Sequence, residues 1–269
     1  MPCVRLWVGV VIGLAIAASA AATAQRASRP APVQPRIAPP RTELSVPFKV
    51  GETLTYDVSW SSYLTAGTAV LSVKEKRPSF NSTAYYIVAE GRPTPLLSKI
   101  YSLYYKLDTL IDTYTLLPQR GSVYSEEGGQ NSVRETTFNR PARRAVFEHR
   151  STSTVKSDLV VPADVQDSLS ALYVLRAVPF RAGDRMTMPV SDGGRNYKMV
   201  LQVTGPERVK TAFGELAAWR LRPIVYDSDN QPVGRDVNIW LSDDSRRLPV
   251  RLQGDLPVGT FVLTLKDAK

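Results

Sequence analysis

The chain has 269 residues, of which 43% are hydrophobic and 22% charged, which is the composition of a globular protein and excludes wholesale disorder. One cysteine and one histidine exclude a zinc finger, a disulfide scaffold and a metal site built on several histidines. The 34 lysines and arginines exceed the 25 acidic residues, so the formal net charge is +9. Because basic runs with interleaved aromatic residues are absent, we expect no nucleic-acid partner.

The first 24 residues have the layout of a secretory signal. A positively charged start is followed by an uncharged apolar run over 6–18, and Ala22 and Ala24 are small residues at the positions that a signal peptidase reads. We therefore predict a periplasmic protein whose signal is cleaved after Ala24. The alternative is an uncleaved anchor, for which the apolar run is marginal across a bilayer about 30 Å thick. Cys3 precedes the apolar run, so the usual signal for lipid attachment is absent.

Residues 25–46 are predicted to form a linker. Five prolines and four arginines stand among small residues, and proline favours an extended chain. The segment is either a solvated spacer or a contact to an anionic envelope surface, made through Arg26, Arg29, Arg36 and Arg41.

Residues 47–269 are predicted to be a single antiparallel β domain. Apolar and polar residues alternate with period two, most clearly where Leu54, Tyr56, Val58 and Trp60 share one side of a strand. The same alternation recurs at 69–73, 85–89, 145–149, 197–203, 219–221, 237–241 and 261–265. Short turn segments separate these runs and favour antiparallel neighbours. The pattern predicts a mainly β fold, with a single curved antiparallel sheet or open barrel that is apolar on one face.

Two segments have helical spacing. Residues 95–105 carry leucine, isoleucine and tyrosine at that spacing, and residues 167–176 follow an N-cap residue, Asp167, with one apolar stripe. Helices this short are unstable alone in water, so we expect both to pack on the concave face of the sheet.

Several segments, in this order, resemble the bacterial exported family known as domain of unknown function 3108. They are VPFKVGETLTYDVSW (46–60), AGTAVLSV (66–73), DSLSALYVLR (167–176), GDRMTMPVSDGG (183–194), PERVKTAFGE (206–215), IWLSDDSRRLPVRLQ (239–253) and LPVGT (256–260). The resemblance implies an exported, β-rich envelope protein, and it implies no catalytic residue because none is assigned for that family.

A weaker similarity concerns architecture. The pattern WLSDDSRRLPVR (240–251), with an earlier copy at 107–120, is similar to one in periplasmic lipoprotein carriers of the Lol type. Those carriers are incomplete barrels with helices over an apolar cavity, so the similarity implies the same architecture here. The local cause is an aspartate that turns the chain and a Leu-Pro pair that restarts a strand, which any antiparallel sheet can use.

We predict no enzymatic activity, no metal and no cofactor. A histidine-dependent nucleophile needs a base, and the single histidine, His149, lies on a predicted strand. Two carboxylate pairs, Glu126-Glu127 and Asp243-Asp244, lie in predicted turns, where acidic residues occur for local reasons. A hydrolase of cell-wall polymer that uses Asp243 or Asp244 stays as an alternative.

The predicted function is binding of a lipid or other amphipathic ligand, or of an envelope partner, in the concave face. The residues expected at the rim and wall of that site are Leu97, Ile100, Tyr101, Tyr104, Trp60, Trp219 and Trp240. The alternative is an envelope scaffold whose interior is filled by side chains. The sequence predicts no particular oligomeric state.

Overall fold

The computed structural model describes residues 41–269 except 62–63, 100–101, 234–235 and 257–258. The predicted signal peptide over 1–24 and residues 25–40 of the predicted linker lie outside this part. The two described helices are α1 (Pro95–Ser98) and α2 (Ser168–Ala177). The strands are β1 (Thr53–Trp60), β2 (Leu64–Ser79), β3 (Ser82–Pro93), β4 (Leu103–Asp112), β5 (Pro118–Glu127), β6 (Gln130–Asn139), β7 (Arg144–Arg150), β8 (Thr154–Val160), β9 (Arg185–Asp192), β10 (Arg195–Thr211), β11 (Gly214–Tyr226), β12 (Pro232–Val233), β13 (Val237–Ser242), β14 (Pro249–Leu256) and β15 (Gly259–Ala268).

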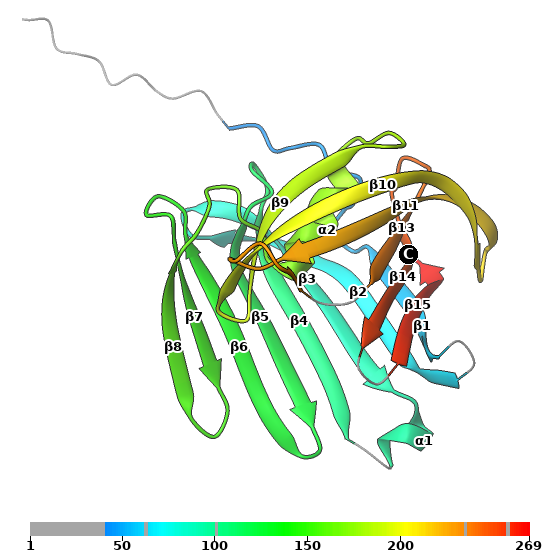
Figure 1. Ribbon diagram of the computed structural model, residues 1–269, viewed down its shortest axis with the longest axis horizontal. Helices are drawn as coiled ribbons and strands as arrows, with labels where there is room; N and C mark the ends of the chain where they lie inside the picture. Colours follow the sequence, from blue (N-terminus) through cyan, green and yellow to red (C-terminus); the bar gives the residue numbers. More distant parts are fainter. Residues whose placement is uncertain (1–40, 62–63, 100–101, 234–235, 257–258) are drawn as a thin grey trace, which may run out of the picture. The chain divides into compact units, whose positions relative to one another are not determined.

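All these strands belong to one antiparallel sheet (Figure 1). Its order is β8-β7-β6-β5-β4-β3-β2-β1-β15-β14-β13-β11-β10-β9, with β12 paired to β11. The pairing of β1 with β15 joins the first and last described strands in the middle of the sheet. The two outer strands, β8 and β9, are not paired with each other, so the sheet stays open. The predicted fold class, a curved antiparallel sheet with two short helices, is confirmed.

The helix that follows Asp167 is confirmed in its position and its cap. One carboxylate oxygen of Asp167 accepts hydrogen bonds from the backbone N–H groups of Leu169 (2.9 Å) and Ser170 (2.7 Å). The Ser170 hydroxyl accepts in turn from the Asp167 N–H at 2.9 Å, which completes a capping box. This cap fixes where α2 begins.

The helix predicted over 95–105 is wrong in its second half. A single turn, Pro95–Ser98, is helical and buries no side chain, so α1 does not pack on the concave face as expected. The chain from Leu103 onward is instead β4, which is hydrogen-bonded to β3 on one side and to β5 on the other. A short run of apolar and tyrosine residues fits both periods, and two full rows of sheet hydrogen bonds decide in favour of the strand.

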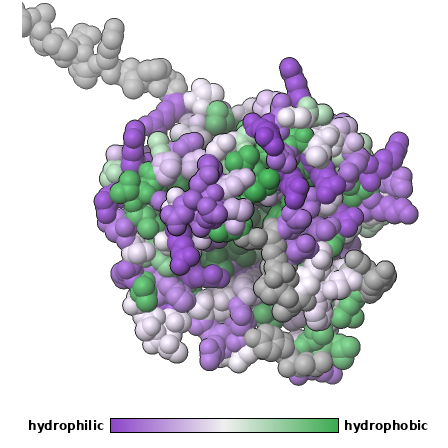
Figure 2. All heavy atoms as spheres, viewed as in Figure 1, coloured by the Kyte–Doolittle hydropathy of each residue, from purple (hydrophilic) through white to green (hydrophobic). Residues whose placement is uncertain are grey.

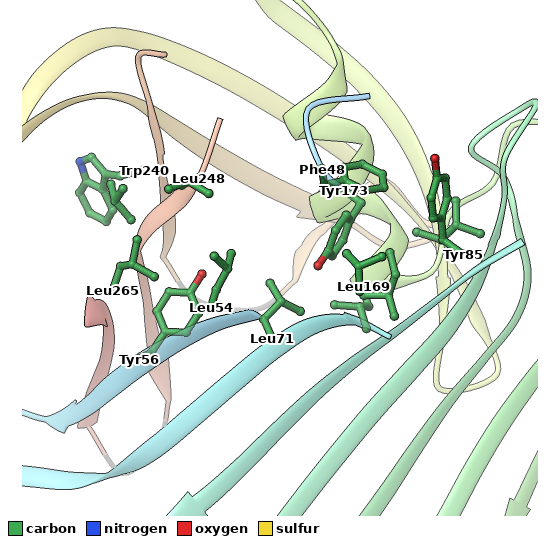
Figure 3. Packing of buried hydrophobic residues seen from close by; sticks show 14 of the residues in the cluster. Phe48, Leu54, Tyr56, Leu71, Tyr85, Leu169, Tyr173, Trp240, Leu248 and Leu265 are labelled. Carbon is green, nitrogen blue, oxygen red and sulfur yellow. The ribbon is translucent and has the colours of Figure 1, made fainter. Parts of the chain in front are cut away.

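One end of the concave face is covered by α2 and by the segment that precedes β1. Figure 3 shows this core, in which side chains of α2 lie against those of β1, β2 and β3. The Phe48 ring makes edge contacts with the rings of Tyr85 (5.2 Å between centroids) and Tyr173 (4.7 Å). The buried cluster consists of Phe48, Leu54, Tyr56, Leu71, Val73, Tyr85, Ile87, Ile111, Leu116, Leu169, Tyr173, Val209, Ala218, Trp240, Leu248, Val250 and Leu265.

A buried ion pair fixes the C-terminal end of α2. Arg176 is 1% exposed, and its two terminal nitrogens donate to the Glu52 carboxylate at 2.6 and 2.9 Å. The same guanidinium donates to the carbonyls of Arg246 and Arg247, each at 3.1 Å. Because these partners satisfy a charge that would otherwise be costly to bury, α2 is held both to the start of β1 and to the turn between β13 and β14.

The two turns with the Asp and Leu-Pro pattern have the same construction. Asp244 accepts two backbone N–H groups of its turn at 2.9 and 3.1 Å, and Asp112 does so at 2.9 and 3.0 Å. The residue two places before the proline, Arg247 or Leu116, has a positive φ of 48° or 56°. The internal repetition seen in the sequence is therefore a real repetition of backbone structure.

Candidate functional site

Burial falls along the concave face with distance from α2. Leu54 and Tyr56 of β1 are 0% and 1% exposed, whereas Val58 and Trp60, two and four residues further along the same face, are only half-buried. Alternation within a strand puts all four side chains on one face. Therefore α2 covers the first part of β1 and leaves the second part uncovered.

Other strands of the sheet show the same change. On β4, Thr109 and Ile111 are fully buried, while Leu107 and Tyr105 on the same face are half-buried. On β15, Leu265 is buried and the next residues on that face, Leu263 and Phe261, are half-buried. A barrel filled by its own side chains would bury this face along its whole length, so the interior beyond α2 is not filled.

Glycines on the concave face give an independent measure of this space. A Cβ added to Gly121 would lie 3.0 Å from a carboxylate oxygen of Asp167, because the start of α2 lies against β5 there. A Cβ added to Gly91 on β3 or to Gly254 on β14 would have no heavy atom within 4 Å. Register places both of these glycines among the half-buried residues, Gly91 opposite Tyr105 and Gly254 opposite Phe261.

We call this uncovered part of the concave face the hollow. Figure 2 shows a recess near the middle of the molecule with hydrophobic atoms at its floor, and Figure 1 shows β4 to β8 extending well beyond α2. The half-buried apolar and aromatic residues that line the hollow come from seven strands. They are Val58, Trp60, Ala69, Ala89, Tyr105, Leu107, Val123, Leu252, Phe261 and Leu263.

The hollow ends in a small cavity beside the start of α2, lined by both polar and apolar side chains. Its volume is about 50 Å³, enough for one or two water molecules. Asp167 lines it, and its second carboxylate oxygen accepts a hydrogen bond from the Thr109 hydroxyl at 2.6 Å. Burial raises the pKa of Asp167 to about 6, against the opposing effect of the hydrogen bonds that it accepts.

Arg134 on β6 lines the same cavity. Register places it directly opposite Val123 on β5 and opposite His149 on β7, on the face that carries the hollow. Its Nε atom is buried and has no hydrogen-bond partner. The hollow therefore has an apolar side on β3 to β5 and carries a guanidinium on β6.

The structure does not bring the seven predicted site residues together. Trp60 lines the hollow, where its ring stacks on Phe261 with 6.2 Å between centroids. Leu97 is half-buried in the exposed turn α1, and Ile100 and Tyr101 lie outside the described residues.

The other three predicted residues lie elsewhere. Tyr104 is on the opposite face of β4 from Leu107, and its hydroxyl donates to Glu90 at 2.6 Å. Trp219 packs at the α2 end, and its indole N–H donates to Asp243 at 2.6 Å. Trp240 is 5% exposed in the main core.

Sequence reasoning missed Tyr105, Leu107 and Arg134, although one signal was available. Tyr105 and Leu107 alternate as strand residues do, and a predicted helix that ended at Tyr105 separated it from Leu107 and hid their common face. Arg134 gives no signal of its own, because its place in the hollow follows from the pairing of β5, β6 and β7.

The two carboxylate pairs serve local structure. Asp244 caps its turn, and Asp243 accepts the Trp219 indole N–H. Glu126 accepts from the Ser102 hydroxyl at 2.9 Å, and Glu127 accepts from Tyr105. In the described part of the chain, no three His, Cys, Asp or Glu side chains gather as a metal site, and neither helix is long and apolar enough to cross a membrane.

Comparisons with known proteins show which solved structures resemble this fold. No curated protein matches the chain. A solved structure of a β-barrel-like protein of domain of unknown function DUF1849 from Brucella abortus is 12% identical, with a TM-score of 0.51 over 81% of this chain and 96% of that one. This likeness concerns the fold alone.

Two further solved structures are more distant. A candidate exported protein with a YmcC-like fold from Bacteroides fragilis is 12% identical, with a TM-score of 0.32 over 85% of this chain and 100% of that one. A candidate lipoprotein from Parabacteroides distasonis is 9% identical, with a TM-score of 0.37 over the same shares. The family model described as "Protein of unknown function (DUF3108)" matches residues 55–266, nearly the whole of the sheet, and the chain belongs to this family.

Proposed function

We propose that this protein is an exported, non-catalytic carrier that binds an amphipathic ligand with an acyl chain in the hollow. The observation that carries the proposal is the fall in burial along the concave face, from Leu54 and Tyr56 under α2 to Val58 and Trp60 beyond it. Export rests on the signal predicted over 1–24.

An acyl chain matches the chemistry of this wall. The wall side chains are apolar or aromatic and retain partial exposure, so a bound chain removes apolar surface of both partners from water. At about 25 cal/mol per Å², burial of roughly 300 Å² contributes about 7 kcal/mol before the entropic cost of binding. Tyr105 and Trp60 add polar atoms at the edge of the hollow, where the ligand emerges into water.

Filling the hollow tests this proposal. The variant Gly91→Phe adds an aromatic side chain where a Cβ would meet no atom within 4 Å, so it should block an acyl chain without disturbing the core. The control Thr68→Phe adds the same ring to an exposed position on β2 that lies on the opposite face. Native mass spectrometry of wild-type protein purified from the periplasm should show a co-purifying lipid.

The expected result is loss of that lipid in Gly91→Phe, its retention in Thr68→Phe, and an unchanged thermal midpoint in both. The alternative, an envelope scaffold without a ligand, is favoured by the close packing of the core against α2, where the cavity beside the start of the helix is only about 50 Å³. Absence of lipid from the wild-type protein, together with failure to bind added dodecyl amphiphiles, would establish the scaffold and overturn the carrier.

A further inference from the structure

We propose that the hollow selects amphiphiles with an anionic head group, and that Arg134 binds this head group. The inference rests on the proposed function and adds the chemical class of its ligand. Its starting point is an arginine on the concave face whose buried Nε has no hydrogen-bond partner among the described residues.

Arg134 differs from the paired arginines of the same limb of the sheet. On the opposite face of the neighbouring strand β5, Arg120 contacts the carboxylates of Asp108 and Glu135. On β7, Arg144 contacts Asp158 at 2.7 Å. Among the described residues, no carboxylate lies within 4.0 Å of an Arg134 nitrogen.

An unpartnered buried N–H of a guanidinium is costly, and an oxyanion removes that cost. The guanidinium presents its donors in a planar fork that fits a carboxylate or a phosphate, and such charge-assisted bonds are the strong ones. The imidazole of His149 stands directly opposite Arg134 and provides a further donor or acceptor. The same chemistry suits either oxyanion.

The acidic residues that line the cavity already have partners. Asp167 accepts hydrogen bonds from two backbone N–H groups and from Thr109. Asp192 accepts from the Ser168 hydroxyl at 3.1 Å. Two buried side-chain atoms of the cavity lining have no hydrogen-bond partner among the described residues, the Arg134 Nε and the Ser191 hydroxyl. Both can donate and only the guanidinium is charged, so a ligand of complementary chemistry is an acceptor with negative charge.

The apolar wall begins next to this arginine. One row of directly opposite residues runs from Arg134 on β6 through Val123 on β5 and Leu107 on β4 to Ala89 on β3. Three strand spacings amount to roughly 14 Å. A head group at Arg134 thus leaves its alkyl chain lying across the apolar strands of the hollow.

The experiment compares three probes that share a dodecyl chain: dodecanoate, dodecyl phosphate and dodecanol. Delipidated full-length protein is titrated with each, and affinity is measured by displacement of a hydrophobic fluorescent dye. Inorganic phosphate serves as the head group without a chain. The variants are Arg134→Gln, Arg134→Lys and the control Arg208→Gln, which removes an exposed arginine on β10.

We expect Arg134→Gln to weaken the affinity for dodecanoate and for dodecyl phosphate by about tenfold or more, and to change the affinity for dodecanol by less than about twofold. The affinity of Arg134→Lys for the two charged probes should lie between those of wild type and Arg134→Gln, because lysine keeps the charge and loses the planar fork. The affinities of Arg208→Gln should match those of wild type. Preference for one of the two oxyanions identifies its source as a fatty acid or a phospholipid. Inorganic phosphate alone should displace no dye.

Equal affinities of wild type for the charged probes and for dodecanol, unchanged in Arg134→Gln, would overturn the anionic head group and leave the carrier standing. Binding of none of the three dodecyl probes overturns both proposals. A lower thermal midpoint for Arg134→Gln would show a structural role for this arginine. In that case the proposal is judged by whether Arg134→Lys has the expected intermediate affinity for the two charged probes.

Discussion

At the scale of single residues, Asp167 combines two roles with opposite demands. Its carboxylate caps α2, which favours negative charge, and it is buried beside the cavity, which disfavours it. Burial prevails and raises the pKa of Asp167 from 3.8 to about 6. Between these two values the native state binds the proton and the unfolded chain does not.

We therefore predict that the titration of Asp167 lowers the stability of the protein as pH rises from about 4 to about 6. Because the native state holds more protons in that window, the free energy of unfolding falls there, by about 3 kcal/mol for a pKa difference of about 2. Asp167→Asn keeps a good N-cap and removes the titration. Urea unfolding should show that the free energy of unfolding of the variant, relative to that of wild type, is higher at about pH 7 than at about pH 4.

The comparison with wild type is needed because other carboxylates act in the opposite direction. Hydrogen bonds from Lys156 and Arg150 lower the pKa of Glu148, so that group adds stability at higher pH. Asp229→Asn, a change at an exposed aspartate, controls for the loss of one carboxylate. An equal pH dependence in Asp167→Asn and wild type would contradict the prediction.

At the scale of elements, the turn between β13 and β14 distinguishes a structural pair of aspartates from a catalytic one. Asp244 accepts from two backbone N–H groups and from the Ser242 hydroxyl at 2.8 Å, and this turn presents two carbonyls to Arg176. Asp243 accepts one exposed indole N–H, from Trp219.

We therefore expect Asp244→Ala to lower the free energy of unfolding by about 2 kcal/mol, and Asp243→Ala by less than about 1 kcal/mol. Urea titration of both variants measures this difference. Equal and negligible losses would contradict the role of Asp244 in the turn, and loss of a cell-wall hydrolase activity without loss of stability would restore the catalytic alternative.

The elements also show what the sequence could reveal. The strand faces of β1 and β15 and the cap of α2 are local patterns, and the faces at 54–60 and 261–265 were predicted correctly. The start of β4 was missed because bulky residues occupy both of its faces, with Tyr104 outside and Tyr105 inside. The site depends on register across several strands, which places Arg134 opposite Val123, and no local pattern carries that information.

At the scale of the whole sheet, its two ends approach each other beside α2. The Asn196 side chain on β10 donates to the carbonyl of Val160 on β8 at 2.7 Å, and Gln166 forms a bridge with Val190 on β9. The turn between β9 and β10 lies against Phe147 of β7. These contacts close the interior at the end that α2 covers.

Gly194 in that turn should be intolerant of any side chain. A Cβ there would lie 2.7 Å from the Phe147 ring, and φ is +76°, so Gly194→Ala adds a clash to backbone strain and should cost about 2 to 3 kcal/mol. The neighbouring Gly193 has φ +57° with no atom within 4 Å, so Gly193→Ala should cost about 1 kcal/mol. Urea unfolding measures both, and equal costs would contradict the close contact.

The lack of pairing between β8 and β9 has a mechanical consequence. A ring of strands joined all the way round has a radius set by strand number and stagger, and it can widen only by breaking main-chain bonds. In this sheet the main-chain hydrogen bonds between the two ends lie beside α2, where Gln166 donates to Pro189 at 2.9 Å and accepts from Ser191 at 2.8 Å, and β8 and β9 themselves are not paired. Beyond the end that α2 covers, β8 and β9 can therefore move apart without the loss of any strand pairing.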